Sequence, residues 1–66
     1  MFKPYKTYSH IGMLDCQILV LKAYRIEDGR YKLKVQWFNK RGMDLGIREN
    51  ITVVKHEVKN WYQTGV

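Results

Sequence analysis

The 66-residue chain has one cysteine, one proline and only 6 acidic side chains, and each scarcity excludes a class of protein. Cys16 has no partner for an intramolecular disulfide, so the fold has to depend on its own core, which fits a reducing, cytoplasmic setting. The longest apolar run, residues 18–21, is far shorter than the roughly 18 residues that a membrane-spanning helix needs. We therefore expect no membrane span, and the lysine-containing, non-apolar start of the chain predicts no secretory signal.

The length and composition predict one folded domain that covers residues 1–66. Hydrophobic residues make up 45% of the chain and charged residues 27%, which are ordinary values for a globular protein. A domain of about 60 residues buries only ~60% of the surface that its unfolded chain exposes, which leaves little room for a deep catalytic pocket. We therefore expect a binding module and not an enzyme.

The cysteine and the two histidines do not form a chemical motif. Asp15 precedes Cys16, and an acidic neighbour raises the pKa of a thiol, which disfavours a reactive nucleophile. Zinc sites use about four Cys or His ligands at short spacings, whereas this chain has Cys16, His10 and His56 far apart. We expect no metal, no cofactor and no catalytic residue.

The chain begins with an arm in which aromatic and cationic residues alternate, from Phe2 to Tyr8. Pro4 and Gly12 disfavour a helix, so residues 1–13 are predicted to be an extended arm that could add to a sheet.

The clearest local signal is a hairpin centred on Asp28-Gly29. This dipeptide favours a two-residue type I′ turn, and from Tyr31 onward apolar and polar residues alternate as in a half-buried strand. A two-residue loop places Arg25 opposite Lys32 and Val20 opposite Trp37. The reverse face is charged near the turn and apolar at the far end, which indicates a long, strongly bent hairpin. One face then collects a predicted core of Val20, Tyr24, Ile26, Tyr31, Leu33, Val35 and Trp37.

The second half of the chain predicts a loop, a strand and a helical turn. Residues 39–46 contain two glycines and read as a loop; residues 47–55 read as a strand, with a bulge or bend at Arg48-Glu49-Asn50. Residues 56–63 place Val58, Trp61 and Tyr62 at helical spacing, with Gly65 ending the turn. We expect Trp61 to pack and Tyr62 to stay partly exposed. The fold class is therefore mainly β, with four to five antiparallel strands and a short C-terminal helical turn.

Residues 14–62 resemble the SH3-like small β-barrels, a group that includes Tudor, KOW and chromo modules, in size and strand order. The segment from Tyr31 to Trp37, followed by a loop containing Gly42, is similar to the second strand of chromodomains. The chain lacks their Trp-Glu-Pro-type segment and the compact glycine pattern of KOW motifs. The resemblance implies a single small SH3-like barrel and transfers no binding residues.

The predicted hairpin register concentrates positive charge on the face behind the core. Arg25 and Lys32 would lie opposite each other, with Arg30 and Lys34 nearby and Glu27 as the only acid. Like charges directly opposite are destabilising, where a mixed pair would contribute about 0.2–1 kcal/mol. Nucleic-acid phosphates would supply the missing anions. The alternative is a solvated face whose charge prevents aggregation.

Two further clusters could extend this surface. In the arm, cations interleave with rings that either stack on bases or cap the open end of a barrel. In the loop, Lys40 and Arg41 precede Gly42, which either permits close approach to a phosphate or belongs to a solvated turn. The candidate nucleic-acid-binding residues are Arg25, Arg30, Lys32, Lys34, Lys40, Arg41, Lys3, Lys6, Tyr5 and Tyr8.

The net charge of +6 leaves the type of partner open. The first hypothesis is a small basic module that binds nucleic acid of unspecified type. The alternative is a protein-interaction module that docks on an acidic protein surface or pairs through its sheet edge. Such a module would suit an accessory subunit or a small viral modulator of a host machine. A barrel that is enzymatic only as an oligomer is a third, less favoured class.

Overall fold

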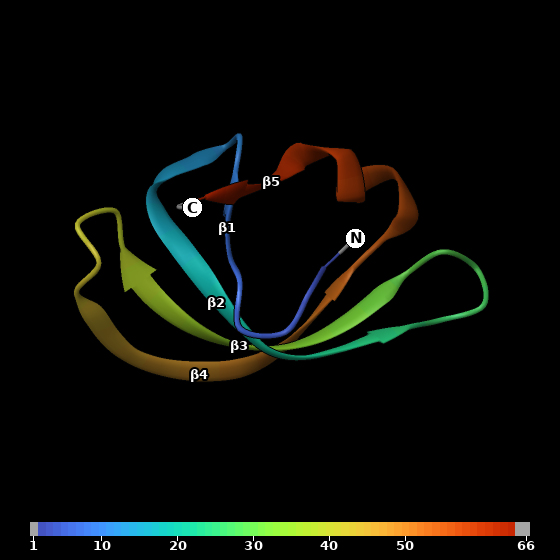
Figure 1. Cartoon of the computed structure of the whole chain (residues 1–66). Helices are drawn as coiled ribbons and strands as arrows, with labels where there is room; N and C mark the ends of the chain where they lie inside the picture. The colour runs from blue at the N-terminus through green and yellow to red at the C-terminus, as the bar shows by residue number, and fades with distance from the viewer. Residues whose placement is uncertain (1, 65–66) are drawn as a thin grey trace.

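The computed structural model describes residues 2–64, which contain one open sheet of five antiparallel strands and a short 3-10 helix. The order across the sheet is β4-β3-β2-β1-β5, so β4 and β5 are its end strands (Figure 1). The prediction of a mainly β chain with four to five antiparallel strands is confirmed. In chain order the elements are β1 (Thr7–His10), β2 (Met13–Arg25), β3 (Tyr31–Asn39), β4 (Asp44–Val53), η1 (Lys55–Asn60) and β5 (Trp61–Thr64).

The long strand β2 bends and thereby shapes the whole sheet. Its pairing with β3 shifts by one residue between Val20 and Lys22, which marks a β-bulge at Leu21. The first half of β2 also pairs with β1, which in turn pairs with β5. Figure 1 shows β2, β3 and β4 curving into a trough, with β1, β5 and η1 on its concave side. The predicted strong bend of the hairpin is confirmed.

The turn between β2 and β3 differs from the predicted one. The N–H of Ile26 donates to the carbonyl of Arg30 at 2.8 Å, so the loop has three residues, Glu27-Asp28-Gly29. Only Gly29 has a positive φ, of 86°, whereas a type I′ turn needs two such residues. The N–H of Arg30 donates to Asp28 Oδ1, which holds the turn in this form. The two-residue loop was therefore wrong, because a single left-handed glycine suffices for the longer turn.

The longer turn moves the β2 side chains of this hairpin by one position. Lys32 lies opposite Tyr24, and Leu33 lies opposite Ala23. Tyr24, predicted to be in the core, therefore faces outward and is 56% exposed, while Ala23 packs against the core. Because side chains alternate between faces, one residue of slip exchanges the two faces of a strand.

The core lies on the concave side of the sheet and includes the N-terminal arm. Phe2 packs against Tyr8, Tyr31 and Trp61, with ring centroids 5.0, 5.3 and 6.3 Å apart. The arm contributes β1 to the sheet, as the extended arm predicted, and two of its rings cap the core. Of the predicted core residues, Val20, Leu33 and Val35 are confirmed as fully buried, and Tyr31 and Trp37 pack partly. The buried hydrophobic residues are Phe2, Tyr8, Ile18, Val20, Leu33, Val35 and Val53.

In the C-terminal third, the position of the bulge and the end of the helical turn differ from the prediction. Arg48-Glu49-Asn50 pairs regularly with β3, and the bulge lies earlier, near Gly46, whose φ is 72°. The helical turn ends at Asn60, and Trp61 begins β5 by pairing with His10. Trp61 packs on the core and Tyr62 is 45% exposed, as predicted. Gly65 lies outside the described residues. No helix within residues 2–64 has the length and apolar character to cross a bilayer.

Candidate nucleic-acid interface

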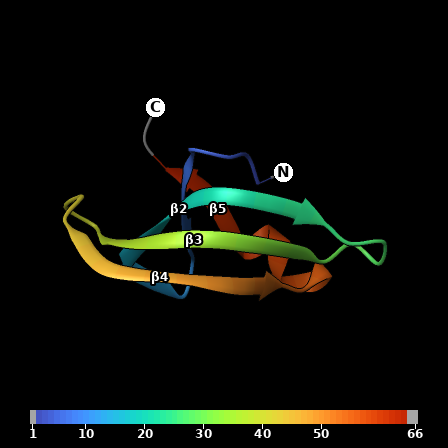
Figure 2. The ribbon, with the colours of Figure 1, turned by 90° about the horizontal axis from the view of Figure 1, so that it is seen from below.

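The convex face of β2, β3 and β4 is the most distinctive surface of the molecule, and Figure 2 shows these three strands side by side from that side. Leu33 and Val35 point into the core, so Lys32, Lys34 and Gln36, which alternate with them on β3, point outward. The residues of β2 and β4 that pair with these three lie on the same outward face. These outward residues are exposed apart from Gln36 and its β2 partner Leu19, which are both partly buried. We call the exposed set the convex patch: Lys22, Tyr24, Lys32, Lys34, Arg48, Asn50 and Thr52.

The convex patch is built from rows of side chains that run across the strands. One row is Lys22, Lys34 and Asn50, and the next is Tyr24, Lys32 and Thr52. Neighbouring strands lie about 4.8 Å apart, so Lys22 and Lys34 are direct cross-strand neighbours of the same charge. A third row begins where Arg48 lies opposite Gln36 and donates from Nε to its Oε1 at 3.1 Å.

The four cations of the convex patch have no acidic partners. None of them forms an ion pair with a carboxylate of residues 2–64, and the rows that carry them contain no acid. Arg30 behaves differently, because its Nε lies 2.8 Å from Asp28 Oδ2 within the turn. That contact lowers the pKa of Asp28 through the hydrogen bond from the Arg30 side chain. Four cations without an ion-pair partner thus lie together on the patch.

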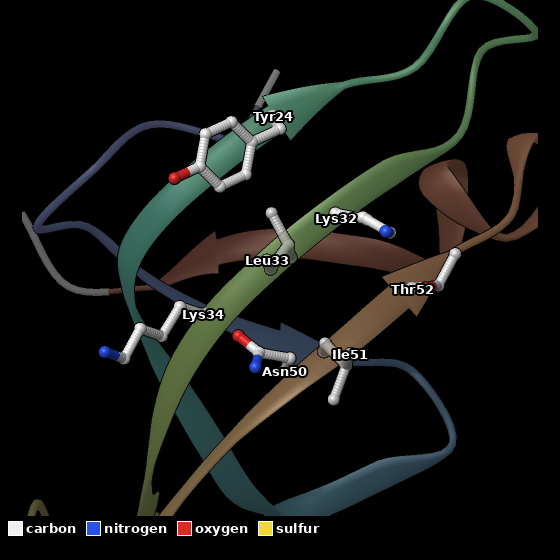
Figure 3. Close-up of a pocket in the computed structure, with 7 residues that line it drawn as sticks. All are labelled: Tyr24, Lys32, Leu33, Lys34, Asn50, Ile51 and Thr52. Atoms are coloured by element: carbon white, nitrogen blue, oxygen red, sulfur yellow. The ribbon is translucent and has the colours of Figure 1, made fainter.

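A shallow hollow of about 190 Å³ lies on the patch between β2 and β4 (Figure 3). Tyr24 and Asn50 lie on the two sides of β3 in this view, with Lys34 beside them. Asn50 and Thr52 make no hydrogen bond through their side chains to other described residues. The hollow therefore offers a ring, cations and free polar groups in one place.

The structure brings together only part of the predicted cationic face. Lys32 and Lys34 lie on the convex patch. Arg25 was wrongly placed, because it pairs with Tyr31 and so lies on the opposite face from Lys32. Arg30 was predicted to lie opposite Glu27, the only acid of that face, whereas its ion pair is with Asp28 in the turn.

The predicted loop cations lie beyond the far end of β3. Asn39 organises this loop, because its Oδ1 accepts from the N–H groups of Arg41 and Met43, each at 2.9 Å. Gly42 has a φ of 88°, and both Lys40 and Arg41 are exposed. They extend the line of β3 beyond the patch and do not belong to its rows.

The arm divides between core and surface. Tyr8 is only 2% exposed, so its ring is not available for stacking and that candidate is wrong. Tyr5 is 77% exposed and has a φ of 64°, rare for a residue with a side chain. Its N–H donates to the carbonyl of Val20 at 2.6 Å, which places the exposed residues Tyr5 and Lys6 beside β2. Lys3 is also exposed.

The cysteine and histidine positions offer no comparable chemistry. Burial, and then the charge of Asp15, raises the pKa of the Cys16 thiol, which agrees with the predicted direction. His10 Nε2 lies 3.1 Å from Glu57 Oε2, and its ring packs edge-on against Trp61. Among residues 2–64, no three His, Cys, Asp or Glu side chains are grouped so that they could hold a metal ion.

The concave side carries two larger but apolar hollows, of about 420 and 250 Å³. Met13 and Trp37 line both. The carboxylates that line these hollows are hydrogen-bonded within the protein. Glu49 accepts from Trp37 Nε1 at 2.9 Å, and Glu57 accepts from Asn60 Nδ2 at 2.6 Å. These hollows have little of the cationic character of the convex patch.

Comparison of the chain with family models, curated proteins and solved structures finds no match, so the patch is interpreted from its own geometry. Sequence reasoning missed five of its residues, namely Lys22, Tyr24, Arg48, Asn50 and Thr52. A signal was present for the first two, because a three-residue loop ending in Gly29 directly pairs Lys22 with Lys34 and Tyr24 with Lys32. The β4 residues depend on a long-range register that no local motif defines.

Proposed function

We propose that this protein is a small SH3-like module that binds nucleic acid through the convex patch. The size, the five antiparallel strands, the bent second strand and the helical turn before the last strand support the SH3-like assignment. In this proposal the protein works by binding and catalyses no reaction. Its lone cysteine fits a reducing compartment, and we assign it to the cytoplasm.

One observation carries the proposal: Lys22 lies directly opposite Lys34, on a face with two more cations and no carboxylate in their rows. Adjacent like charges destabilise a sheet, so this arrangement does not serve the fold. An array of phosphates on a partner would neutralise it and release counterions on binding. A face that served solubility alone would tolerate interspersed acids, which these rows lack.

The test is a salt titration of binding with a matched pair of double variants. Fluorescence anisotropy with labelled DNA and RNA should show affinity falling steeply between about 50 and 200 mM salt. The variant Lys22→Gln/Lys34→Gln should bind more weakly, with its logarithmic salt slope reduced by about two for two lost phosphate contacts. Lys55→Gln/Lys59→Gln removes the same charge from η1, which lies on the concave side of the sheet (Figure 1), and should bind nearly as the wild type.

Two results would overturn the proposal. The first is an affinity for DNA and RNA that is absent or independent of salt. The second is equal weakening in the two double variants, which would mean that total charge and not the patch determines binding.

The free edge of β4 favours a second candidate, a protein-interaction module. β4 pairs with β3 on one side only within residues 2–64, so its other edge offers backbone donors and acceptors to an extended peptide. Exposed Leu45 and Ile47 lie on this strand beside an apolar hollow. A tagged copy should then capture a protein partner in the presence of nuclease. The variant Asn50→Pro should abolish the capture, because proline lacks the backbone N–H, while Asn50→Ala should retain it.

A further inference from the structure

We propose that the convex patch selects single-stranded nucleic acid, with one unpaired base stacked on Tyr24 and flanking phosphates bound by its lysines. This inference rests on the proposed function and names the class of nucleic acid. It starts from a side chain whose position the fold does not explain. Tyr24 is 56% exposed on the outer face, while the core on the other side of the sheet holds most of the aromatic rings.

The residues around Tyr24 suit the binding of a base and its phosphate backbone. Lys32 lies directly opposite it, and Lys22 lies two residues away on the same strand and the same face. A flat ring beside cations allows a base to stack while the adjacent phosphates pair with the lysines. Tyrosine is suited to this role because every base has a π-face, so stacking tolerates any sequence.

The hollow beside Tyr24 supplies groups that can hydrogen-bond the edge of the base. Asn50 and Thr52 line it from β4, and no described residue uses their side chains. An asparagine amide presents a donor and an acceptor together, which matches the paired groups on a base edge. Figure 3 shows Asn50 across β3 from Tyr24, so a base stacked on the ring would extend over β3 toward the amide.

The shape of the patch disfavours a duplex. Bases in a duplex present only their edges in the grooves, so Tyr24 has no base face to stack on. The major groove, about 12 Å wide, admits a helix or a two-stranded ribbon. The patch spans three strands at about 4.8 Å spacing, and its side chains widen it further. A single strand can splay its bases onto such a sheet, as RNA loops do on other β-sheet platforms.

The experiment compares single strands with a duplex in a series of Tyr24 variants. The probes are labelled DNA and RNA oligonucleotides of about a dozen nucleotides and a DNA duplex of the same length, within the usual range of site sizes. Tyr24→Ala should lose about 10-fold or more in affinity for the single strands, since stacking contributes that much per base, with the salt slope unchanged. Tyr24→Phe should retain the affinity, and Tyr24→Leu should not. Tyr62→Ala, an exposed tyrosine on β5, is the matched control.

The outcomes separate this inference from the proposed function. If Tyr24→Ala binds single strands as the wild type does while the double lysine variant is weakened, the patch binds phosphates but Tyr24 does not stack, and the inference fails alone. Duplex binding at least as tight as single-strand binding also overturns it. If neither variant changes affinity, the proposed function fails as well. Thermal unfolding of each variant checks that the loss is not caused by misfolding, which is not expected at so exposed a position.

Discussion

The two faces of the β2–β3–β4 sheet use their charged groups in opposite ways. On the concave side, Glu57 is hydrogen-bonded to Asn60 and His10, and Glu49 is hydrogen-bonded to Trp37. On the convex side, Lys22, Lys32 and Lys34 have no carboxylate partner among residues 2–64. The acids of the first face help to hold the fold together, whereas these three lysines of the second face form no ion pair that would stabilise it.

The residues that determine stability and those proposed to bind therefore lie on different faces of the sheet. Changes on the concave side should alter the free energy of unfolding, and changes on the convex patch should alter binding with little effect on unfolding. The chain is small enough for this contrast to be measured, because a domain of this length has a total stability of only about 3–10 kcal/mol.

The strongest test of the contrast is Ile18→Ala. Ile18 is completely buried, and removing its side chain should cost about 2–5 kcal/mol through lost burial and a residual cavity, enough to unfold much of the population. Urea denaturation followed by circular dichroism measures this. Thr52→Ala, on the exposed face, should change the stability by less than about 1 kcal/mol. Equal losses in the two variants would contradict the assignment of the core to one face.

A second, smaller effect concerns Tyr5, whose left-handed backbone is unusual for a residue with a side chain. Its φ of 64° costs about 1–2 kcal/mol in an L-residue, and a glycine would avoid this at an entropic cost of about 0.5–1 kcal/mol. Tyr5→Gly should therefore leave the stability unchanged or raise it by up to about 1 kcal/mol, as thermal unfolding would show. Tyr24→Gly, at another exposed tyrosine that lies within a strand, should destabilise. A marked loss in Tyr5→Gly would mean that its ring packs against the protein.

The sequence predicted much of this architecture and missed most of the patch, for a physical reason. Alternation around Leu33 and Val35 is a local property, so the inward face of β3 was predicted correctly. The partner of each residue depends on the turn and on the bulge at Leu21, which shifts the register a second time. One residue of slip was enough to exchange Tyr24 with Ala23 and to separate Arg25 from Lys32.

The arm and β4 illustrate a second limit. The same alternation of rings and cations in the arm is compatible with stacking and with packing, and the choice depends on what lies beneath. Phe2 and Tyr8 are buried because they pack on the apolar residues of the concave side of the bent sheet. Tyr5 lies in a turn and is exposed. Arg48, Asn50 and Thr52 joined the patch through pairing across the sheet, which no local pattern encodes.

The third prediction reverses one charge on the convex patch. Lys34→Glu replaces a like-charged cross-strand pair with an opposite-charged pair with Lys22, and should stabilise the fold by about 0.2–1 kcal/mol while weakening nucleic-acid binding. Unfolding at low and high salt tests the cause, because the gain should disappear near 1 M salt, where charges are screened over about 3 Å. Lys59→Glu on η1 is the control. A loss of stability in Lys34→Glu would show that this lysine serves the fold.

The smallest expected effect lies on the concave side and depends on pH. The hydrogen bond from Asn60, and then that from His10, lowers the pKa of Glu57 below its ordinary value of 4.5, with a smaller contribution from the charge of His56. A carboxyl whose pKa is lower in the folded than in the unfolded state adds stability above its unfolded pKa, and this stability is lost as the pH falls through the folded pKa. The free energy of unfolding should therefore decrease as the pH falls below about 4.5.

Glu57→Gln isolates this contribution, because the amide cannot ionise. Asp28 titrates in the same direction, since Arg30 also lowers its pKa, so Asp28→Asn is needed as the parallel variant. Urea titrations at a series of acidic pH values should show a shallower pH dependence in each single variant and the shallowest in the double variant, because the two carboxyls lie in separate ion pairs and act independently. A Glu57→Gln variant with the full wild-type pH dependence would mean that the contact with His10 and Asn60 does not persist in solution, and that the carboxylates of the concave side are as free as the cations of the convex patch.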